Sequence, residues 1–252
     1  MRIASLGSGS RGNATLVQSD STLLLVDCGF SAKETEARLA RLGLQAGDID
    51  AVLVTHEHSD HISGVARLSR KHQLPVYLSR GTSASGRCDG TWQTHYFHSE
   101  ADFVIGDIEV APIAVPHDAR EPCQFVFTCG PRRIGVLTDL GSITPAVTRH
   151  FQGCQALLLE CNHDAEMLEN GPYPYPLRQR VGGDWGHLNN VQAADLLRQV
   201  QGEELQHLIV AHISEKNNHR DRVHSALAEV YQAMEKIVWA DQSAGFSWLA
   251  LD

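Results

Sequence analysis

THEHSDH, residues 55–61, places three histidines and acidic side chains within seven consecutive positions. The apolar run AVLV, residues 51–54, comes directly before it and predicts a buried strand. The histidines therefore begin where a strand ends, and such positions are where α/β proteins usually place ligands and catalytic groups. Neutral imidazole and carboxylate are ligands for zinc and similar first-row metals. We expect the rest of the chain to bring further ligands to this loop.

The bulk composition suits one globular domain, or at most two small ones. The chain has 252 residues, of which 42% are hydrophobic and 20% are charged. Its net charge of −9 does not indicate a general surface for nucleic acids or anionic membranes, although bound divalent cations would offset part of that charge. The six cysteines form no CxxC pair and predict buried thiols. No apolar run reaches the ~20 residues that span a bilayer, so we expect a cytoplasmic protein.

Four further apolar runs of strand-like composition precede polar residues that can bind metals. The runs are residues 108–115, 133–138, 156–159 and 208–211, and the polar residues after them are His117, Asp139, the run 160–164 and His212. If these strand ends converge on residues 56–61, their side chains form a site for two metals. Structural zinc sites are usually closed by cysteines, so histidine and aspartate ligands indicate a catalytic site.

Strand and helix patterns recur in both halves of the chain. Hairpin patterns occur at residues 14–26 and 124–138, and amphipathic helices are expected over residues 190–200 and 223–234. Each half is a set of strands followed by helices, which favours two packed sheets with helices outside. Residues 170–186 contain three prolines among glycines and arginines, so we expect an exposed loop there.

Two features have both a functional and a structural interpretation. The glycine-rich loop at residues 7–13 resembles a phosphate-binding turn, but such turns are common without a ligand. A group of basic residues could hold a nucleic-acid backbone or form a solvated surface. Its members are Arg178, Arg180, Lys216, Arg220 and Arg222.

The pattern His56-x-His58-x-Asp60-His61 resembles the signature of the metallo-β-lactamase superfamily. His117, Thr138-Asp139 and Val210-Ala211-His212 follow in the order typical of that superfamily, so the resemblance covers nearly the whole chain. It implies an α/β fold, the αβ/βα sandwich, in which two mixed β-sheets pack face to face with helices outside. It also implies that residues 1–252 form a single domain.

The resemblance implies two divalent metal ions in a cleft at one edge of the sandwich. One ion would bind His56, His58 and His117, the other would bind Asp60, His61 and His212, and Asp139 would bridge them. Zinc or manganese is expected in the first place and iron as the alternative, because imidazole and carboxylate suit all three. We assign catalysis to Asp60 and His187.

Further details of the sequence narrow the resemblance to one branch of the superfamily. Asp60-His61, in place of Asp-Arg or Asp-Cys, resembles hydrolases with two complete metal sites, such as glyoxalase II and tRNase Z, and differs from the true β-lactamases. The 73 residues from Asp139 to His212 exclude the β-CASP insertion of RNase J. Four stretches resemble the YycJ/WalJ-like branch, which has been linked to 5′-to-3′ exonuclease activity on DNA. These stretches are residues 7–13, 160–164, 186–190 and 212–218.

The function implied by this resemblance is phosphodiester hydrolysis on DNA, in which a hydroxide between the two metals attacks phosphorus. His187 is the expected general acid, and its structural alternative is a residue that packs against the helix from Asn190. The residues that we expect to contact substrate are Ser10, Asn13, Asn162, His163 and Asn217. The alternative function is hydrolysis of a small thioester, lactone or cyclic phosphodiester, and a non-enzymatic metal-binding module is the third.

Overall fold

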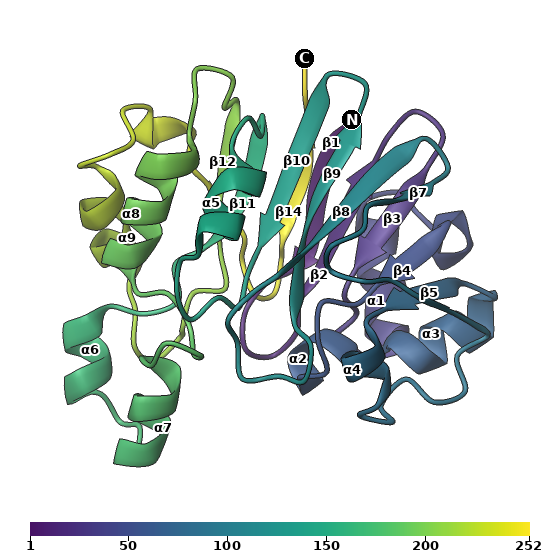
Figure 1. Cartoon of the computed structure of the whole chain (residues 1–252), viewed down its shortest axis with the longest axis horizontal. Coiled ribbons are helices and arrows are strands. Elements are labelled where there is room, and N and C mark those ends of the chain that lie inside the picture. Colours follow the sequence, from purple (N-terminus) through teal and green to yellow (C-terminus); the bar gives the residue numbers. More distant parts are fainter.

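Two seven-stranded β-sheets pack face to face in the computed structural model, which describes residues 1–252 (Figure 1). The strands of the first sheet are, in spatial order, β14 (Phe246–Ala250), β1 (Arg2–Gly7), β2 (Ala14–Gln18), β3 (Leu23–Val26), β4 (Ala51–Leu53), β5 (Pro75–Leu78) and β6 (Gln93–Tyr96). The strands of the second sheet are β13 (Val238–Trp239), β12 (His207–Ala211), β11 (Ala156–Glu160), β10 (Arg132–Leu137), β9 (Cys123–Cys129), β8 (Ile108–Ala114) and β7 (Phe103–Ile105).

Helices cover the outer face of each sheet (Figure 1). The first sheet carries α1 (Ala32–Arg41) and α3 (Val65–His72), and the second carries α5 (Pro145–Phe151), α8 (Asn190–Val200) and α9 (Arg220–Leu227). The shorter elements are α2 (Ser59–Ile62), α4 (Arg80–Ser83), α6 (Ala165–Asn170), α7 (Tyr175–Val181) and the 3-10 turns Ala46–Asp48 and Met234–Lys236. None of these helices has the length and the apolar character that a membrane crossing requires.

Three buried clusters of apolar side chains hold the four layers together. One lies between the sheets and includes Phe125 and Phe127. Another joins the first sheet to α1 and α3, and the third joins the second sheet to α5, α8 and α9. The expected αβ/βα sandwich is therefore confirmed. All six cysteines are free thiols, and five of them are buried in or beside these clusters.

The local sequence accounts for the helix boundaries. Helix α1 begins after Ser31, whose side chain accepts a hydrogen bond from the Glu34 N–H, and it ends before Gly43, which has φ +73°. Helix α8 begins with a capping box formed by Asn189 and Gln192, each of which bonds the backbone N–H of the other. The capping box begins α8 at the position that the sequence pattern predicted, residue 190.

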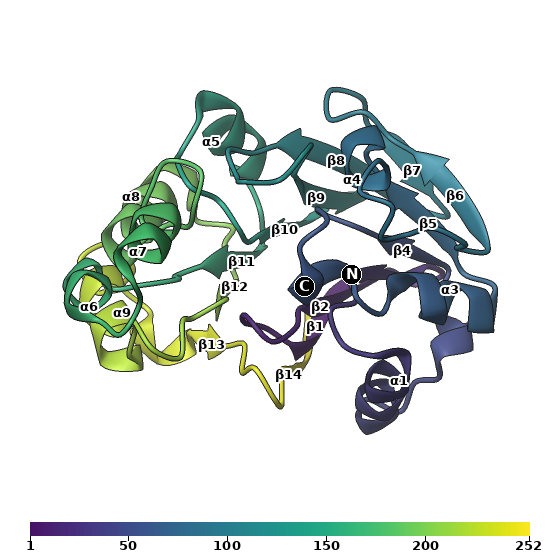
Figure 2. The ribbon, with the colours of Figure 1, turned by 90° about the horizontal axis from the view of Figure 1, so that it is seen from below.

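The carboxyl ends of the parallel strands meet at one edge of the sandwich. Strands β3 to β6 run parallel in the first sheet, and β10 to β13 run parallel in the second. Strand β8 also points this way, because it is antiparallel to β9 and β9 is antiparallel to β10. The loops that follow β4, β8, β10 and β12 therefore emerge together, and Figure 2 looks onto this edge from below.

The structure differs from the predicted elements in three segments. Residues 170–186 lie at the surface as predicted, but they are not a loop throughout, because they contain α7, which has Pro174 as its N-cap and Pro176 in its first turn, where proline is tolerated. The predicted helix over residues 223–234 ends at Leu227 instead, and a turn carries Tyr231 back to the core, so the apolar spacing is satisfied without a helix. Residues 80–100, for which no element was predicted, contain α4 and β6.

Candidate metal centre

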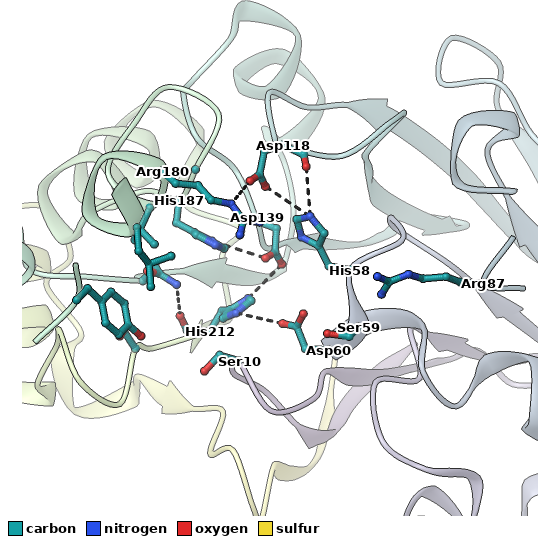
Figure 3. Close-up of a pocket in the computed structure, with 16 residues that line it drawn as sticks. Ser10, His58, Ser59, Asp60, Arg87, Asp118, Asp139, Arg180, His187 and His212 are labelled. Carbon is teal, nitrogen blue, oxygen red and sulfur yellow. Dashed lines mark hydrogen bonds and ion pairs between the residues drawn. The ribbon is translucent and has the colours of Figure 1, made fainter. Parts of the chain in front are cut away.

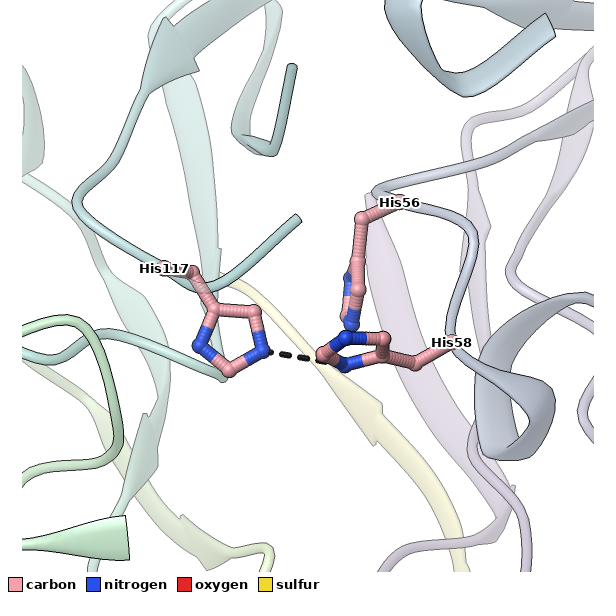
Figure 4. Close-up of side chains that lie close together, drawn as sticks. All are labelled: His56, His58 and His117. Atoms are coloured by element: carbon pink, nitrogen blue, oxygen red, sulfur yellow. Dashed lines mark hydrogen bonds between the residues drawn. The ribbon is translucent and has the colours of Figure 1, made fainter. Parts of the chain in front are cut away.

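The loops at this edge bring three histidines into contact. His56 and His58 follow β4, and His117 follows β8 (Figure 4). The His117 Nε2 lies 3.2 Å from the His58 Nδ1, and the ring centroids of the trio are 4.6 to 4.9 Å apart. Two nitrogens bound to one tetrahedral zinc at about 2.0–2.1 Å would lie about 3.4 Å apart. The trio therefore has the spacing of three ligands to one ion.

The charge state of the trio also suits metal binding. Burial lowers the pKa of His56 well below its ordinary value and lowers the pKa of His117. Neutral imidazole has a free nitrogen lone pair, which is the form that binds metals. The His56 Nε2 is buried and has no hydrogen-bond partner. Because buried polar atoms almost always have a partner, this orphaned nitrogen indicates a ligand that the protein alone does not supply.

A second group lies beside the trio and consists of Asp60, His61 and His212. The His61 Nε2 lies 3.4 Å from the Asp60 Oδ2, and the His212 Nε2 lies 3.8 Å from the same oxygen. Burial alone would raise the pKa of Asp60, but His61 and His212 outweigh it and lower the pKa. Asp60 is therefore an ionised carboxylate between two imidazoles.

Asp139 lies between the two groups. Its Oδ2 is 3.1 Å from the His212 Nδ1 and 3.2 Å from the His61 Nε2, and its Oδ1 is 3.9 Å from the His117 Nε2. Burial would raise the pKa of Asp139, but His212 and His61 hold it well below its ordinary range. A carboxylate with one oxygen toward each group has the position of a bridging ligand. The donors of the two groups are nitrogen and carboxylate oxygen, and they fit two divalent ions.

Asp27, at the end of β3, supports the second group from behind. Its Oδ2 lies 2.7 Å from the His61 Nδ1 and accepts a hydrogen bond from the Thr55 hydroxyl, and its Oδ1 accepts from the Thr55 N–H, both at 2.8 Å. Such a contact places one proton of His61 on Nδ1 and turns Nε2 toward Asp60 and Asp139. Burial lowers the pKa of His61, but Asp139, Asp60 and Asp27 outweigh it and raise that pKa well above its ordinary value, so a metal at Nε2 would replace a proton there. The sequence pattern did not single out Asp27, although it follows a strand just as the predicted ligands do.

Three side chains of this centre sit on backbone in the left-handed region. Asp27, Asp139 and His212 have φ values of 61°, 53° and 50°. Only one other residue that is not glycine, Gln73, has a positive φ. Aspartate and histidine tolerate this conformation better than most residues, and such strain concentrates at functional sites. The sharp turns aim each side chain back from its strand end toward the centre.

Glu160, at the end of β11, is a fully buried carboxylate that contacts Asp139 and the segment that carries His187. Its Oε2 accepts a hydrogen bond from the Asp139 N–H at 2.8 Å and lies 2.9 Å from the His187 Nδ1. Its Oε1 accepts from the Leu188 N–H at 2.8 Å. Burial lowers the pKa of His187, but Glu160 and Asp139 outweigh it and raise that pKa to about 9. His187 is therefore a cationic donor beside Asp139 (Figure 3).

A cavity of about 300 Å³ opens beside these groups, and 16 residues line it. His58, Asp60, Asp139, His187 and His212 form its polar floor (Figure 3).

Two arginines face the same cavity. Arg180 pairs with Asp118, whose Oδ1 lies 3.5 Å from the His117 Nε2. Arg87 points toward His58 from the opposite side and forms no ion pair (Figure 3). Arg87 lies in a segment where the sequence showed no clear pattern, so it was not among the predicted site residues.

The structure brings the seven predicted metal ligands and His187 together, and it divides the predicted substrate contacts. Ser10 and Asn162 line the cavity. Asn13, His163 and Asn217 do not, because all three are buried outside it. Asn13 instead contacts the Asp60 Oδ2 at 3.2 Å.

The glycine-rich loop and the run 160–164 have structural contacts of their own. The Asn13 Oδ1 accepts a hydrogen bond from the Gly9 N–H, and the Ser8 hydroxyl accepts one from the His212 N–H. These bonds use polar groups that a phosphate would need. Asp164 caps α6 through a hydrogen bond from the Met167 N–H.

Comparisons with known proteins match almost the whole chain. The family model described as "Beta-lactamase superfamily domain" matches residues 22–213. Exodeoxyribonuclease YycJ of Bacillus anthracis is 38% identical over 231 residues, which cover 90% of this chain and 88% of that protein. Exodeoxyribonuclease WalJ of Streptococcus pneumoniae strain D39 is 32% identical over 254 residues, which cover 98% and 92%. The metallo-β-lactamase fold protein YhfI from Bacillus subtilis superposes with a TM-score of 0.77 at 19% identity, covering 99% of each chain, and this likeness concerns the fold alone.

Proposed function

This chain belongs to the metallo-β-lactamase superfamily and is a metal-dependent hydrolase, and from that premise we propose that it is a binuclear phosphodiesterase that degrades DNA from an end. The observation that carries this proposal is the pair of ligand groups that share Asp139, with His187 beside them. The names of the two relatives supply the substrate class, since both are exodeoxyribonucleases. In this proposal residues 1–252 act as one catalytic domain in the cytoplasm.

The metal ligands are proposed as follows. His56, His58 and His117 hold one ion, and Asp60, His61 and His212 hold the other, with Asp139 shared. Zinc and manganese are the proposed metals, with iron as the alternative, because the donors are imidazole and carboxylate. Bound divalent ions supply Lewis-acid stabilisation of the charge that develops on phosphoryl oxygens.

His187 is proposed to donate the proton that the leaving oxygen needs. Glu160 holds its Nδ1 at 2.9 Å, which leaves Nε2 for a ligand in the cavity. A pKa of about 9 means that His187 carries its proton at neutral pH, as a general acid must. Glu160 is fully buried and is not a proposed metal ligand, so its carboxylate is the group that stabilises the cationic form of His187.

The cations in the cavity support a phosphate substrate. The chain is acidic overall, so a general electrostatic attraction to DNA is not what draws it in. Arg87 and Arg180 nevertheless face the metal groups from two sides (Figure 3). Guanidinium is well suited to phosphate oxygens because it presents several N–H donors in one plane. Asp118 neutralises Arg180, so Arg87, which forms no ion pair, is the guanidinium that is available to a phosphate beside the metal groups.

The test is a substrate screen on metal-loaded protein. The enzyme is expected to shorten end-labelled DNA oligonucleotides and to hydrolyse bis(p-nitrophenyl) phosphate, with much lower activity on thioesters and lactones. Metal analysis should find two ions per chain, and a variant with His56 and His58 both replaced by alanine should lose one of them. Hydrolysis of thioesters without any cleavage of phosphodiesters would refute the proposed function. Undiminished metal content in the double variant would refute the ligand assignment.

A further inference from the structure

One wall of the cavity is apolar, and a single segment supplies all of it. Of the 16 residues that line the cavity, three are hydrophobic, namely Tyr173, Leu177 and Val181. Leu177 and Val181 are four residues apart on α7, so they lie on one face of that helix. Tyr173 precedes the helix by two residues. We call these three side chains the apolar wall.

Core packing does not explain the apolar wall. None of its residues belongs to the three buried clusters or packs against them. Helix α7 has no buried residue at all, and α6 and α7 project from the sandwich at the edge that carries the metal centre (Figure 1). Apolar side chains that face a cavity without joining a core are typical of ligand-binding surfaces.

The rest of the cavity has the opposite chemistry. Its floor carries His58, Asp60, Asp139 and His187, and the guanidinium of Arg87 reaches in from the far side (Figure 3). A ligand that satisfies both parts has an anionic group for the floor and a flat apolar surface for the wall. A nucleotide has both, as its phosphate and its base. Aromatic side chains bind any base by stacking, because every base presents a π face.

We propose that the apolar wall binds the base of the terminal nucleotide while its phosphodiester lies over the metal centre, with the ring of Tyr173 as the stacking surface. This inference rests on the proposed function and assigns its substrate specificity to α7 and the residues just before it. The Lys216 Nζ lies 5.8 Å from the centroid of the Tyr173 ring, and this cation–π contact helps to hold the ring in place. The wall recognises a base as such and does not read its identity, because it offers no pair of polar groups at a base edge.

The experiment compares two single-stranded oligonucleotides that differ only in the terminal nucleotide at the cleaved end, which carries a base in one and is abasic in the other. For the wild-type enzyme, kcat/KM is expected to favour the normal oligonucleotide roughly 5- to 100-fold, the range that base–aromatic stacking supports. Tyr173→Ala should bring this ratio close to one by slowing cleavage of the normal oligonucleotide. Tyr173→Phe should keep the ratio, because the ring remains.

Tyr175→Ala is the matched control, because Tyr175 lies on the same segment, is 63% exposed and does not line the cavity. It should keep the wild-type ratio. Leu177→Ala provides a second variant of the wall and should lower the ratio in part. Equal rates on the two oligonucleotides for the wild-type enzyme, or a wild-type ratio in Tyr173→Ala, would refute base binding by the apolar wall and would leave the proposed nuclease function intact. If the wild-type enzyme cleaves neither oligonucleotide, the proposed function is wrong, and the proposed base binding by the apolar wall is then wrong as well.

Discussion

Replacing Asp27 by asparagine should weaken metal binding at a position that is not itself a ligand. The change keeps the shape of the side chain, and the amide oxygen of the new asparagine, in the place of Oδ1, would still accept the Thr55 N–H. The amide nitrogen would then occupy the place of Oδ2, 2.7 Å from the His61 Nδ1. An N–H in that place must donate, so Nδ1 would have to accept and the ring proton would move to Nε2. His61 would then present an N–H, and not a lone pair, to the metal groups.

The size of the effect follows from the role of such supporting carboxylates. Loss of one typically lowers metal affinity or activity 10- to 100-fold, which corresponds to about 1.4–2.7 kcal/mol. The effect should be largest for the ion held by Asp60, His61 and His212, because Asp27 contacts His61 directly. Asp27 reaches His56 only through the Thr55 hydroxyl, which lies 2.9 Å from the His56 Nδ1, so the affinity of the trio that contains His56 should change less.

The assay is competition with a chelator, in which metal release is followed at increasing chelator concentration and the number of ions per chain is measured. Two release steps are expected for the wild-type protein, and one of them should shift much further than the other in Asp27→Asn. Asp50→Asn is the matched control, because Asp50 also accepts a backbone hydrogen bond, from the Leu23 N–H at 2.7 Å, but lies away from the centre. Wild-type affinity at both sites in Asp27→Asn would refute the assigned role of this carboxylate.

Four further predictions follow, two on the general acid His187, one on Arg87 and one on the metals. His187→Ala should lower kcat by about 10²- to 10⁴-fold while metal content stays at two ions, and unchanged kcat would exclude it as the general acid. Because a raised pKa keeps His187 protonated below about pH 9, activity should fall as the pH rises through that value, and Glu160→Gln should move the fall to lower pH in a pH–rate profile. Arg87→Gln should raise KM for DNA and reduce the slope of log KM against log salt concentration by about 0.7, which is the contribution of one phosphate contact on a single strand. The control Arg67→Gln, at an exposed residue outside the cavity, should change neither quantity. Removing the metals with a chelator should lower Tm in a thermal melt, because the folded protein loses the free energy of metal binding. That free energy is about 2.7 kcal/mol when the metal is present at 100 times its Kd. An unchanged Tm would contradict a structural contribution of the ions.

The candidate metal centre could largely be predicted from the sequence because its proposed ligands follow a local rule. His56, His117, Asp139 and His212 each lie within two residues of the end of an apolar run, and such runs predict strands without knowledge of their neighbours. The predicted sandwich then requires these strand ends to share an edge. The same rule marks Asp27, which follows the strand that ends at Val26, but the ligand pattern of the resembling family does not include this position, so its role was not predicted.

The helix boundaries of two segments could not be predicted from the local sequence. Three prolines in residues 170–186 indicated a loop, yet two of them lie at the start of α7, where they remove no hydrogen bond of the helix. The apolar spacing of residues 223–234 indicated a helix, yet a turn buries Tyr231 equally well. In both segments the local pattern allowed two backbone conformations, and contacts with the rest of the chain selected one of them.

The sequence by itself determined the order and the chemistry of the ligands, because strand-forming runs and the side chains after them are local properties. Only the tertiary structure decided which groups support those ligands and what faces them. Glu160 reaches His187 across 27 residues, and Asp27 reaches His61 across 34. The apolar wall of α7 meets the metal centre only because α6 and α7 project from that edge of the sandwich (Figure 1). Such contacts depend on the summed packing of four layers, and no short stretch of sequence encodes that sum.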